Sequence, residues 1–171
     1  METFEVGDAV VHPRLGAGVV TGFEEVKTGE EPKRYYNIKI LRKTPTNLLV
    51  PVDEADGLVR HALTSTRLEE IWEVLGDDPE KLPKNHRTRH KFLREKLATG
   101  DPMKVAESLR DLAWRRTTRD RGLTTRGKRL YRKSLQLLAG EVAVIKDVEL
   151  ATARRQITKR LKKFIAAHVS E

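Results

Sequence analysis

The segment TSTRLEEIWEVLG, residues 64–76, marks a change in the periodicity of the sequence. Its apolar residues recur at intervals of three or four, as on one face of a helix: Leu68, Ile71, Trp72 and Leu75. Gly76 is a helix stop signal. Before this segment, short runs show the alternation of apolar and polar residues that is typical of strands. The chain is therefore predicted to be α+β, with a β module at residues 1–63 and a helical module at residues 64–171.

Upstream of this segment, short runs rich in β-branched and aromatic residues are separated by turns that contain Gly or Pro. The runs cover residues 8–12, 17–26, 34–41 and 46–51. Four or five strands in so short a stretch predict a small, bent antiparallel sheet or barrel. A module of this size is expected to be too small to hold a cofactor.

Downstream of Gly76, helical periodicity predicts four more helices, and so a compact five-helix all-α domain. They are expected at residues 85–98, from Pro102 to about Arg119, from Thr124 through Ile145, and from about Asp147 to His168. Asp101 is a favourable N-cap before Pro102, and Thr124 has the same role for the next helix.

The composition excludes several classes of protein. Hydrophobic residues make up 38% of the chain and charged residues 35%, which indicates a globular protein with a highly charged surface. There is no cysteine, so disulfides, thiolate catalysis and Cys-bearing zinc sites are excluded. The start METFEVGDAVV lacks the basic residues of a signal peptide, and no segment reaches the ~18 apolar residues of a membrane span. We expect a cytoplasmic protein.

The net charge of +9 is distributed unevenly. Residues 1–63 hold 8 basic and 10 acidic residues, whereas residues 64–171 hold 26 and 15. Within the second part, residues 84–133 hold 17 basic and only 5 acidic residues. A block of this kind predicts contact with nucleic acid or with an acidic protein surface.

The segment KNHRTRHKFLREKL, residues 84–97, could be interpreted as a metal site because His86 and His90 lie four residues apart on a helix. Zinc sites of the H-E-x-x-H type have Glu where this chain has Arg87, and the flanking positions are also basic. Positive charge around a dication is unfavourable, and no third ligand is evident. The sequence does not favour a metal site. It also contains no nucleophile elbow and no phosphate-binding loop, so no motif in it indicates an enzyme.

The basic residues of this segment instead predict a surface for nucleic acid. On the helix at 85–98 a stripe of cationic and imidazole side chains is expected opposite Phe92, Leu93 and Leu97; it consists of Arg87, His90, Lys91 and Arg94. The helix that Thr124 caps begins with free backbone N–H groups beside Arg126, Lys128 and Arg129. A helix N-terminus with adjacent cations suits phosphate, so readout of the DNA backbone or shape is expected.

Four collinear blocks of this sequence resemble the CarD/CdnL family of bacterial transcription regulators. They are FEVGDAVVHPRLGAGVV (4–20), LLVPVDEA (48–55), LREKLATGDPMKVAESLRDL (93–112) and RGLTTRGKRLYRKSLQLLAGEVA (121–143). The resemblance spans nearly the full length of the chain, and none of the four blocks contains a catalytic motif.

This resemblance implies an adaptor without enzymatic activity or a cofactor, with a monomer favoured. A Tudor-like N-terminal module would bind the β subunit of RNA polymerase by aligning strand edges. The polymerase-binding residues would be Lys27, Arg34, Tyr36, Asn47, Leu48 and Leu49. The helical module would contact the minor groove and phosphate backbone of promoter DNA at the upstream edge of the transcription bubble, altering the stability of the open complex.

The family's DNA-contacting helix generally carries a Trp wedge, and that position aligns with His86. Arg89 and Lys91 match basic positions of the family. The DNA-binding residues would be His86, Arg87, Arg89, His90, Lys91, Arg94, Thr124, Arg126, Lys128 and Arg129. Two alternatives stay open at this point: a non-specific architectural protein that binds nucleic acid without polymerase, and a protein whose partners are acidic proteins rather than DNA.

Overall fold

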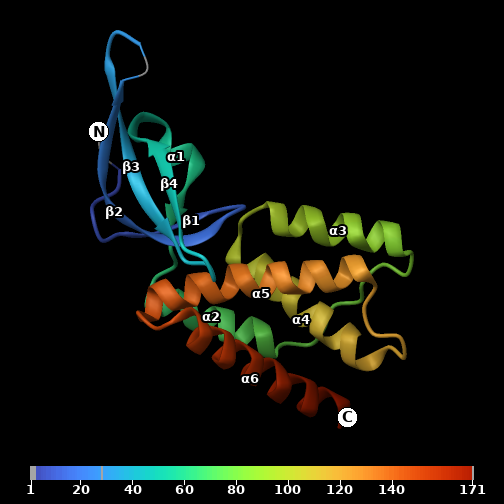
Figure 1. Ribbon diagram of the computed structural model, residues 1–171. Helices are drawn as coiled ribbons and strands as arrows, with labels where there is room; N and C mark the ends of the chain where they lie inside the picture. Colours follow the sequence, from blue (N-terminus) through green and yellow to red (C-terminus); the bar gives the residue numbers. More distant parts are fainter. Residues whose placement is uncertain (1–2, 28, 171) are drawn as a thin grey trace.

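The N-terminal part of the protein is an antiparallel sheet that stands at one end of a helical bundle (Figure 1). The computed structural model describes residues 3–27 and 29–170. The sheet has the strand order β4-β3-β2-β1-β5. Its strands are β1 (Ala9–His12), β2 (Gly16–Lys27), β3 (Pro32–Ile40), β4 (Thr46–Pro51) and β5 (Arg60–His61).

The long strand β2 gives the sheet its bend. It pairs with β1 through its first residues and with β3 along most of its length, with a register shift between Val20 and Gly22. Such a bulge increases the local twist. Within the described residues β4 and β5 lie at opposite edges and do not pair, so the sheet is open rather than a closed barrel.

Between β4 and β5 lie a short 3-10 turn, η1 (Val52–Glu54), and a single helical turn, α1 (Ala55–Leu58). Neither was predicted from the sequence, because four residues cannot display a helical period. Ala55 is fully buried and belongs to the core of the sheet, together with Phe4, Ile38 and Val50. This tertiary contact therefore accounts for the position of the turn.

The predicted change to helix after Leu63 is confirmed, and helices follow one another to the end of the described chain. They are α2 (Ser65–Gly76), α3 (His86–Ala98), α4 (Pro102–Thr118), α5 (Thr125–Lys146) and α6 (Leu150–Val169). Both predicted N-caps are present: the Asp101 carboxylate accepts from Met103 N at 2.9 Å, and Thr124 Oγ1 accepts from Gly127 N at 3.0 Å.

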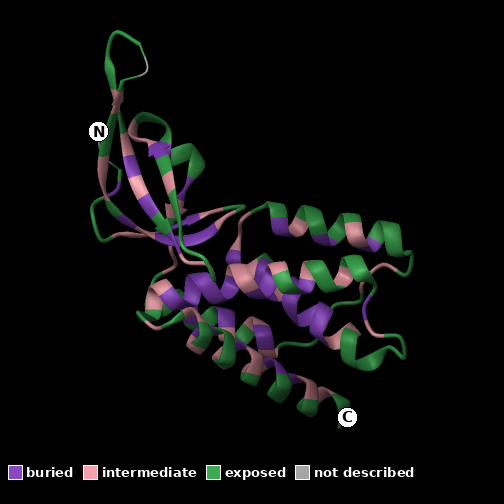
Figure 2. Cartoon of the chain, viewed as in Figure 1, coloured by how far each residue is buried: buried purple, intermediate pink, exposed green. Residues whose placement is uncertain are grey.

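Helices α4 and α5 form the centre of the bundle, and their buried faces appear as the purple segments in Figure 2. Helix α3 contacts α4 and α5, whereas α6 contacts α2, α4 and α5. The central pair therefore separates α3 from α6, which lie on opposite sides of the bundle (Figure 1). This arrangement leaves an outward face on each of the two outer helices.

A charged pair joins the sheet to the bundle. Arg60 of β5 donates from Nη1 and Nη2 to the two carboxylate oxygens of Glu141 in α5, at 2.8 and 2.7 Å. The same carboxylate accepts from Leu63 N at 2.9 Å. Beside it, α5 lies so near β2 that a Cβ at Gly140 would be 3.5 Å from that of Ala17. Together these contacts fix the sheet against α5.

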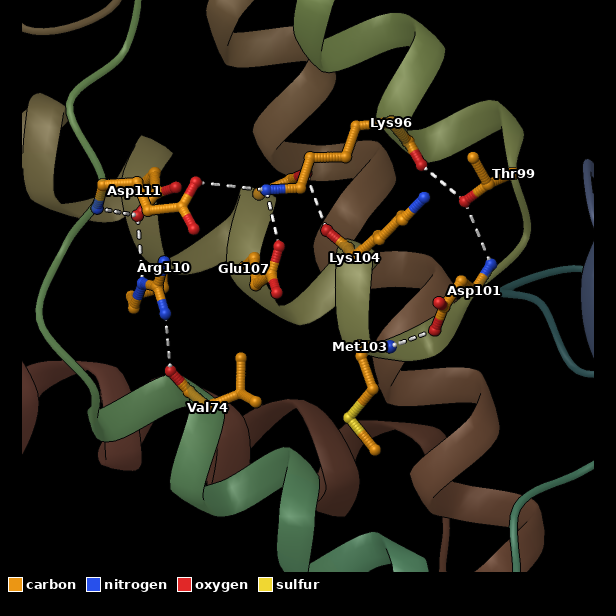
Figure 3. Close-up of polar contacts among 11 residues, drawn as sticks. Val74, Lys96, Thr99, Asp101, Met103, Lys104, Glu107, Arg110 and Asp111 are labelled. Carbon is orange, nitrogen blue, oxygen red and sulfur yellow. Dashed lines mark hydrogen bonds and ion pairs between the residues drawn. The ribbon is translucent and has the colours of Figure 1, made fainter.

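A second polar network holds the segment between α2 and α3 (Figure 3). Asp111 Oδ1 accepts from Arg110 Nε at 2.9 Å and from Glu80 N at 3.0 Å. Burial raises the pKa of Asp111, although its hydrogen bond with Arg110 opposes the rise. Lys96 Nζ of α3 lies 2.6 Å from the Glu107 carboxylate of α4 and 3.7 Å from that of Glu80. These contacts hold the segment before α3 and the last turn of α3 against α4.

Candidate nucleic-acid interface

Helix α3 begins at an exposed corner of the bundle. Asn85 caps it, because its Oδ1 accepts from Arg87 N at 2.9 Å and from Thr88 N at 3.2 Å. The first helical residue is His86, whose side chain is exposed. The residue at the predicted wedge position therefore projects from the helix end, where a flat ring can reach a ligand without repacking the bundle.

The outward side of α3 carries three exposed cations, Arg87, Lys91 and Arg94. Within residues 3–27 and 29–170, no carboxylate forms an ion pair with any of them. Their spacing of three and four residues puts them on one side of the helix. Phe92, predicted on the apolar face, is instead 41% exposed, because α3 packs only through a narrow line around Leu93 and Leu97.

Arg89 occupies a different position from the one expected. Arg89 is only 8% exposed. Its Nη1 donates to the carbonyl oxygens of Pro83 and Lys84, at 3.2 and 3.0 Å. These bonds fold the segment before α3 back onto the helix. The position does not suit a direct phosphate contact, so we assign Arg89 a positioning role and remove it from the candidate contact surface.

His90 lies half-buried between α3 and the beginning of α5. Its Nδ1 is buried and has no hydrogen-bond partner within the described parts of the chain. Burial lowers the pKa of His90, and Arg126 and Arg94 lower it further. The guanidinium groups of Arg89 and Arg115 border the same small hollow. His90 therefore belongs to the seam between two helices rather than to an open stripe.

We expect His90 to make the folded protein sensitive to acid. Its pKa is lower in the folded than in the unfolded chain, so the unfolded state binds more protons and stability falls as pH drops through about 6.5. His90→Gln should therefore lose less stability than the parent between pH 7.5 and 5.5. Urea unfolding at both pH values measures this difference. Equal losses in the two proteins would contradict the expectation.

The N-terminus of α5 adjoins α3 across this seam. Arg126, Lys128 and Arg129 are exposed in its first turns, and that turn contains no acidic residue. Because Thr124 Oγ1 caps only the N–H of Gly127, other backbone donors of the turn remain for a ligand. The exposed cations of α3 and α5 thus form one surface, which we call the α3–α5 face: Arg87, Lys91, Arg94, Arg126, Lys128 and Arg129.

The basic end of α4 was not among the contact residues predicted from the sequence. Burial lowers the pKa of Arg115, and the nearby charges of Arg89 and Arg119 lower it further. Burial and the charge of Arg119 lower the pKa of Arg89 in the same way. Arg115 and Arg119 border a hollow of about 350 Å³ together with Lys84. A repeated Arg at the end of a helix was the signal that could have identified them. These three cations therefore lie near the start of α3, outside the α3–α5 face as defined.

The predicted polymerase-binding residues lie on three strands of the sheet. Asn47 and Leu49 are exposed on the edge strand β4, and Leu48 is half-buried. Lys27 is exposed at the end of β2. Arg34 of β3 places its guanidinium carbon 3.9 Å from the ring centroid of Phe23. An edge strand has a row of backbone groups without a partner strand, and β4 is one of the two edge strands of the described sheet.

Tyr36 is a correction to this set. It is fully buried in an interior strand, and its hydroxyl accepts from Phe4 N at 3.1 Å. An aromatic residue within a strand can occupy the core or the surface, and here the alternation places it in the core. Its role is to pack the sheet, and it cannot contact a partner directly.

The described residues contain no group of three or more His, Asp or Glu side chains that could hold a metal ion. No helix among them is both long and apolar enough to cross a bilayer. The exposed cations of the α3–α5 face and the open edge of β4 are two candidate contact surfaces of the described residues.

Comparison with known proteins agrees with this two-part organisation. The family model described as CarD-like/TRCF RID domain matches residues 4–62, and that described as CarD, C-terminal domain matches residues 70–158, more than half of the chain. A Bacillus subtilis (strain 168) protein named "Putative transcription factor YdeB" is 28% identical over 150 residues, which cover 85% of this chain and 94% of that protein. The chain belongs to the CarD family of transcription regulators.

Proposed function

We propose that this protein binds the β subunit of RNA polymerase through β4 of a Tudor-like sheet. We further propose that it contacts promoter DNA through the α3–α5 face, at the upstream edge of the transcription bubble. The net effect is a changed stability of the open complex, with no reaction catalysed. The family supports regulation of transcription through interaction with RNA polymerase, and the β subunit and the DNA site are our extension of it.

The segregation of charge is the observation that carries this proposal. Residues 1–63 hold more acidic than basic residues, whereas the exposed cations of the α3–α5 face have no carboxylate partner within the described residues. An unpaired cationic surface releases counterions when it meets phosphates, which gives affinity without reading sequence. A near-neutral sheet gains little from counterion release and is better suited to a protein partner.

The geometry of α3 suggests how the DNA contact could affect melting. The cations at positions 87, 91 and 94 would hold the phosphate backbone, and the helix N-terminus of α5 adds backbone donors beside them. His86 at the exposed end of α3 would then face the base steps. A ring at this point stabilises separated bases by stacking on them.

We expect His86→Trp to lengthen the lifetime of the open complex. Indole offers a larger stacking surface than imidazole, and a base-stacking side chain contributes ~1–3 kcal/mol, so an increase of about threefold to tenfold is expected. A promoter-release assay with competitor measures this lifetime. His86 is exposed, so the substitution should fold normally. A shorter lifetime would remove the wedge assignment.

We expect Leu49→Asp to weaken polymerase binding about tenfold or more. Leu49 is 40% exposed on the β4 edge, and a carboxylate there disfavours alignment with another strand. Val169→Asp is a matched control, because Val169 is 58% exposed at the far end of α6. Both variants are tested by pull-down of RNA polymerase from the same organism. Equal binding by Leu49→Asp and the parent would place the polymerase contact elsewhere.

The open-complex lifetime with and without the protein tests the function as a whole. The proposal requires that the protein change this lifetime and that Leu49→Asp reduce the change. If the protein were a non-specific architectural protein, the parent and Leu49→Asp would bind promoter DNA equally well, and neither would need contact with polymerase. An effect on the lifetime that does not depend on the β4 edge would favour that alternative.

A further inference from the structure

Helix α6 carries a second cationic surface that the α3–α5 face does not include. Between Leu150 and Val169 the sequence has six Lys or Arg residues and no acidic residue. Five of the six are exposed: Arg154, Arg155, Lys159, Lys162 and Lys163. The sixth, Arg160, is half-buried and donates from Nε to the carbonyl oxygen of Trp72 at 3.2 Å.

The exposed cations are arranged along one side of the helix. Arg155, Lys159 and Lys162 follow at intervals of four and three residues, which forms a row along the axis, with the other two beside it. Within the part of the chain that the structure describes, none of the five forms an ion pair with a carboxylate. Internal charge pairing therefore does not explain this row.

The inward side of α6 limits the kind of partner. Ala153, Ile157, Leu161 and Phe164 are buried against the bundle, so the apolar side of this basic helix cannot enter a membrane. No aromatic side chain lies among the exposed cations, whereas protein interfaces are usually centred on such anchors. A row of cations without an apolar centre fits the regular phosphates of a duplex better than an acidic protein.

We propose that α6 is a second duplex-binding face, which contacts a DNA segment other than the one held by the α3–α5 face. Helices α3 and α6 lie on opposite sides of the bundle, with α4 and α5 between them (Figure 1). Each packs its buried side against the bundle, so the exposed cations of α3 and those of α6 lie on outward sides. One straight duplex cannot touch both. This inference rests on the proposed DNA contact of the α3–α5 face, and it adds the capacity to hold two duplex segments at once.

Three variants of the full chain test this proposal. The first is the α6 variant Arg155→Gln, Lys159→Gln, Lys162→Gln, in which glutamine preserves helix propensity. The second, Arg14→Gln, Lys39→Gln, Lys43→Gln, removes the same charges from exposed positions of the N-terminal module. A third, Arg87→Gln, Lys91→Gln, Arg94→Gln, removes cations of the α3–α5 face. Circular dichroism confirms that each variant is folded.

The readout is capture of a fluorescent 30-bp duplex by an immobilised 30-bp duplex in the presence of protein. The parent and the N-terminal variant should capture it, and the α6 variant should lose capture at least tenfold while still binding one duplex within about threefold of the parent. The salt dependence of the lost contact should have a slope of about −2.7 in log K against log salt for three phosphates.

Each other outcome has a definite meaning. Equal capture by the α6 variant and the parent overturns the proposal that α6 binds a second duplex. Protein dimers that bridge two duplexes through their α3–α5 faces would then explain the capture. Single-duplex binding by all variants but no capture by the parent also overturns it, leaving the proposed function intact. If the α3–α5 variant binds one duplex as the parent does and the α6 variant binds none, the proposed function has the wrong DNA face.

Discussion

Replacing Arg87, Lys91 and Arg94 together by glutamine is expected to reduce affinity for promoter DNA about 100-fold at 0.1 M salt. The three side chains are exposed and lack carboxylate partners among the described residues, so each is available for a phosphate. Each phosphate contact contributes ~0.9 to the slope of log K against log salt, so the slope should become shallower by about 2.7.

Fluorescence anisotropy with a duplex fragment, measured over a range of salt concentrations, gives both quantities. The loss should be nearly equal for different sequences, because backbone contacts carry little sequence information. Arg14→Gln, Lys39→Gln, Lys43→Gln provides the control with the same change in net charge. If that control lost as much affinity, net charge rather than the α3–α5 face would explain binding.

Replacing Glu141 by alanine is expected to lower the free energy of unfolding by about 2–4 kcal/mol. The Glu141 side chain is only 5% exposed and accepts hydrogen bonds from Arg60 and from Leu63 N. Its removal leaves the Leu63 N–H without its acceptor and the Arg60 guanidinium without its counter-charge, with only the carbonyl oxygens of His61 and Gly100 as its acceptors among the described residues. The Arg60 side chain is 35% exposed, so water recovers part of the cost and the estimate lies below that of a fully buried pair.

Urea unfolding of the parent and the variant measures this loss. Glu70→Ala is the matched control, since Glu70 also lies on a helix and pairs with Arg67, but both side chains are more than half exposed. A surface pair of this kind contributes about 0–1 kcal/mol. The prediction is wrong if Glu141→Ala and Glu70→Ala have the same stability.

The fold was predictable where local patterns decide the structure. The change of period after Leu63, the four longer strands and the caps at Asp101 and Thr124 all depend on residues close together in sequence, and each is confirmed. Helix α1 and strand β5 were missed because they are too short to show a period. They form where Ala55 and Val59 complete the core of the sheet.

The candidate sites were predicted less completely, because a charged residue does not reveal its partner in the sequence. Arg89 and Arg94 look alike in the sequence, yet the first is buried against two carbonyl groups and the second is exposed. Glu141 resembles any surface glutamate until Arg60, 81 positions away, is placed beside it. Such assignments depend on contacts between distant segments, which periodicity does not report.

The charged pair between Arg60 and Glu141 also fixes the distance between the two candidate surfaces. The β4 edge belongs to a sheet that this pair and the close approach of Gly140 to Ala17 hold against α5, whose first turn forms part of the α3–α5 face. The span between the two surfaces is therefore set when the chain folds. If both proposed contacts form, the distance between them is fixed by the fold. The position at which β4 binds RNA polymerase then determines which base step lies opposite His86.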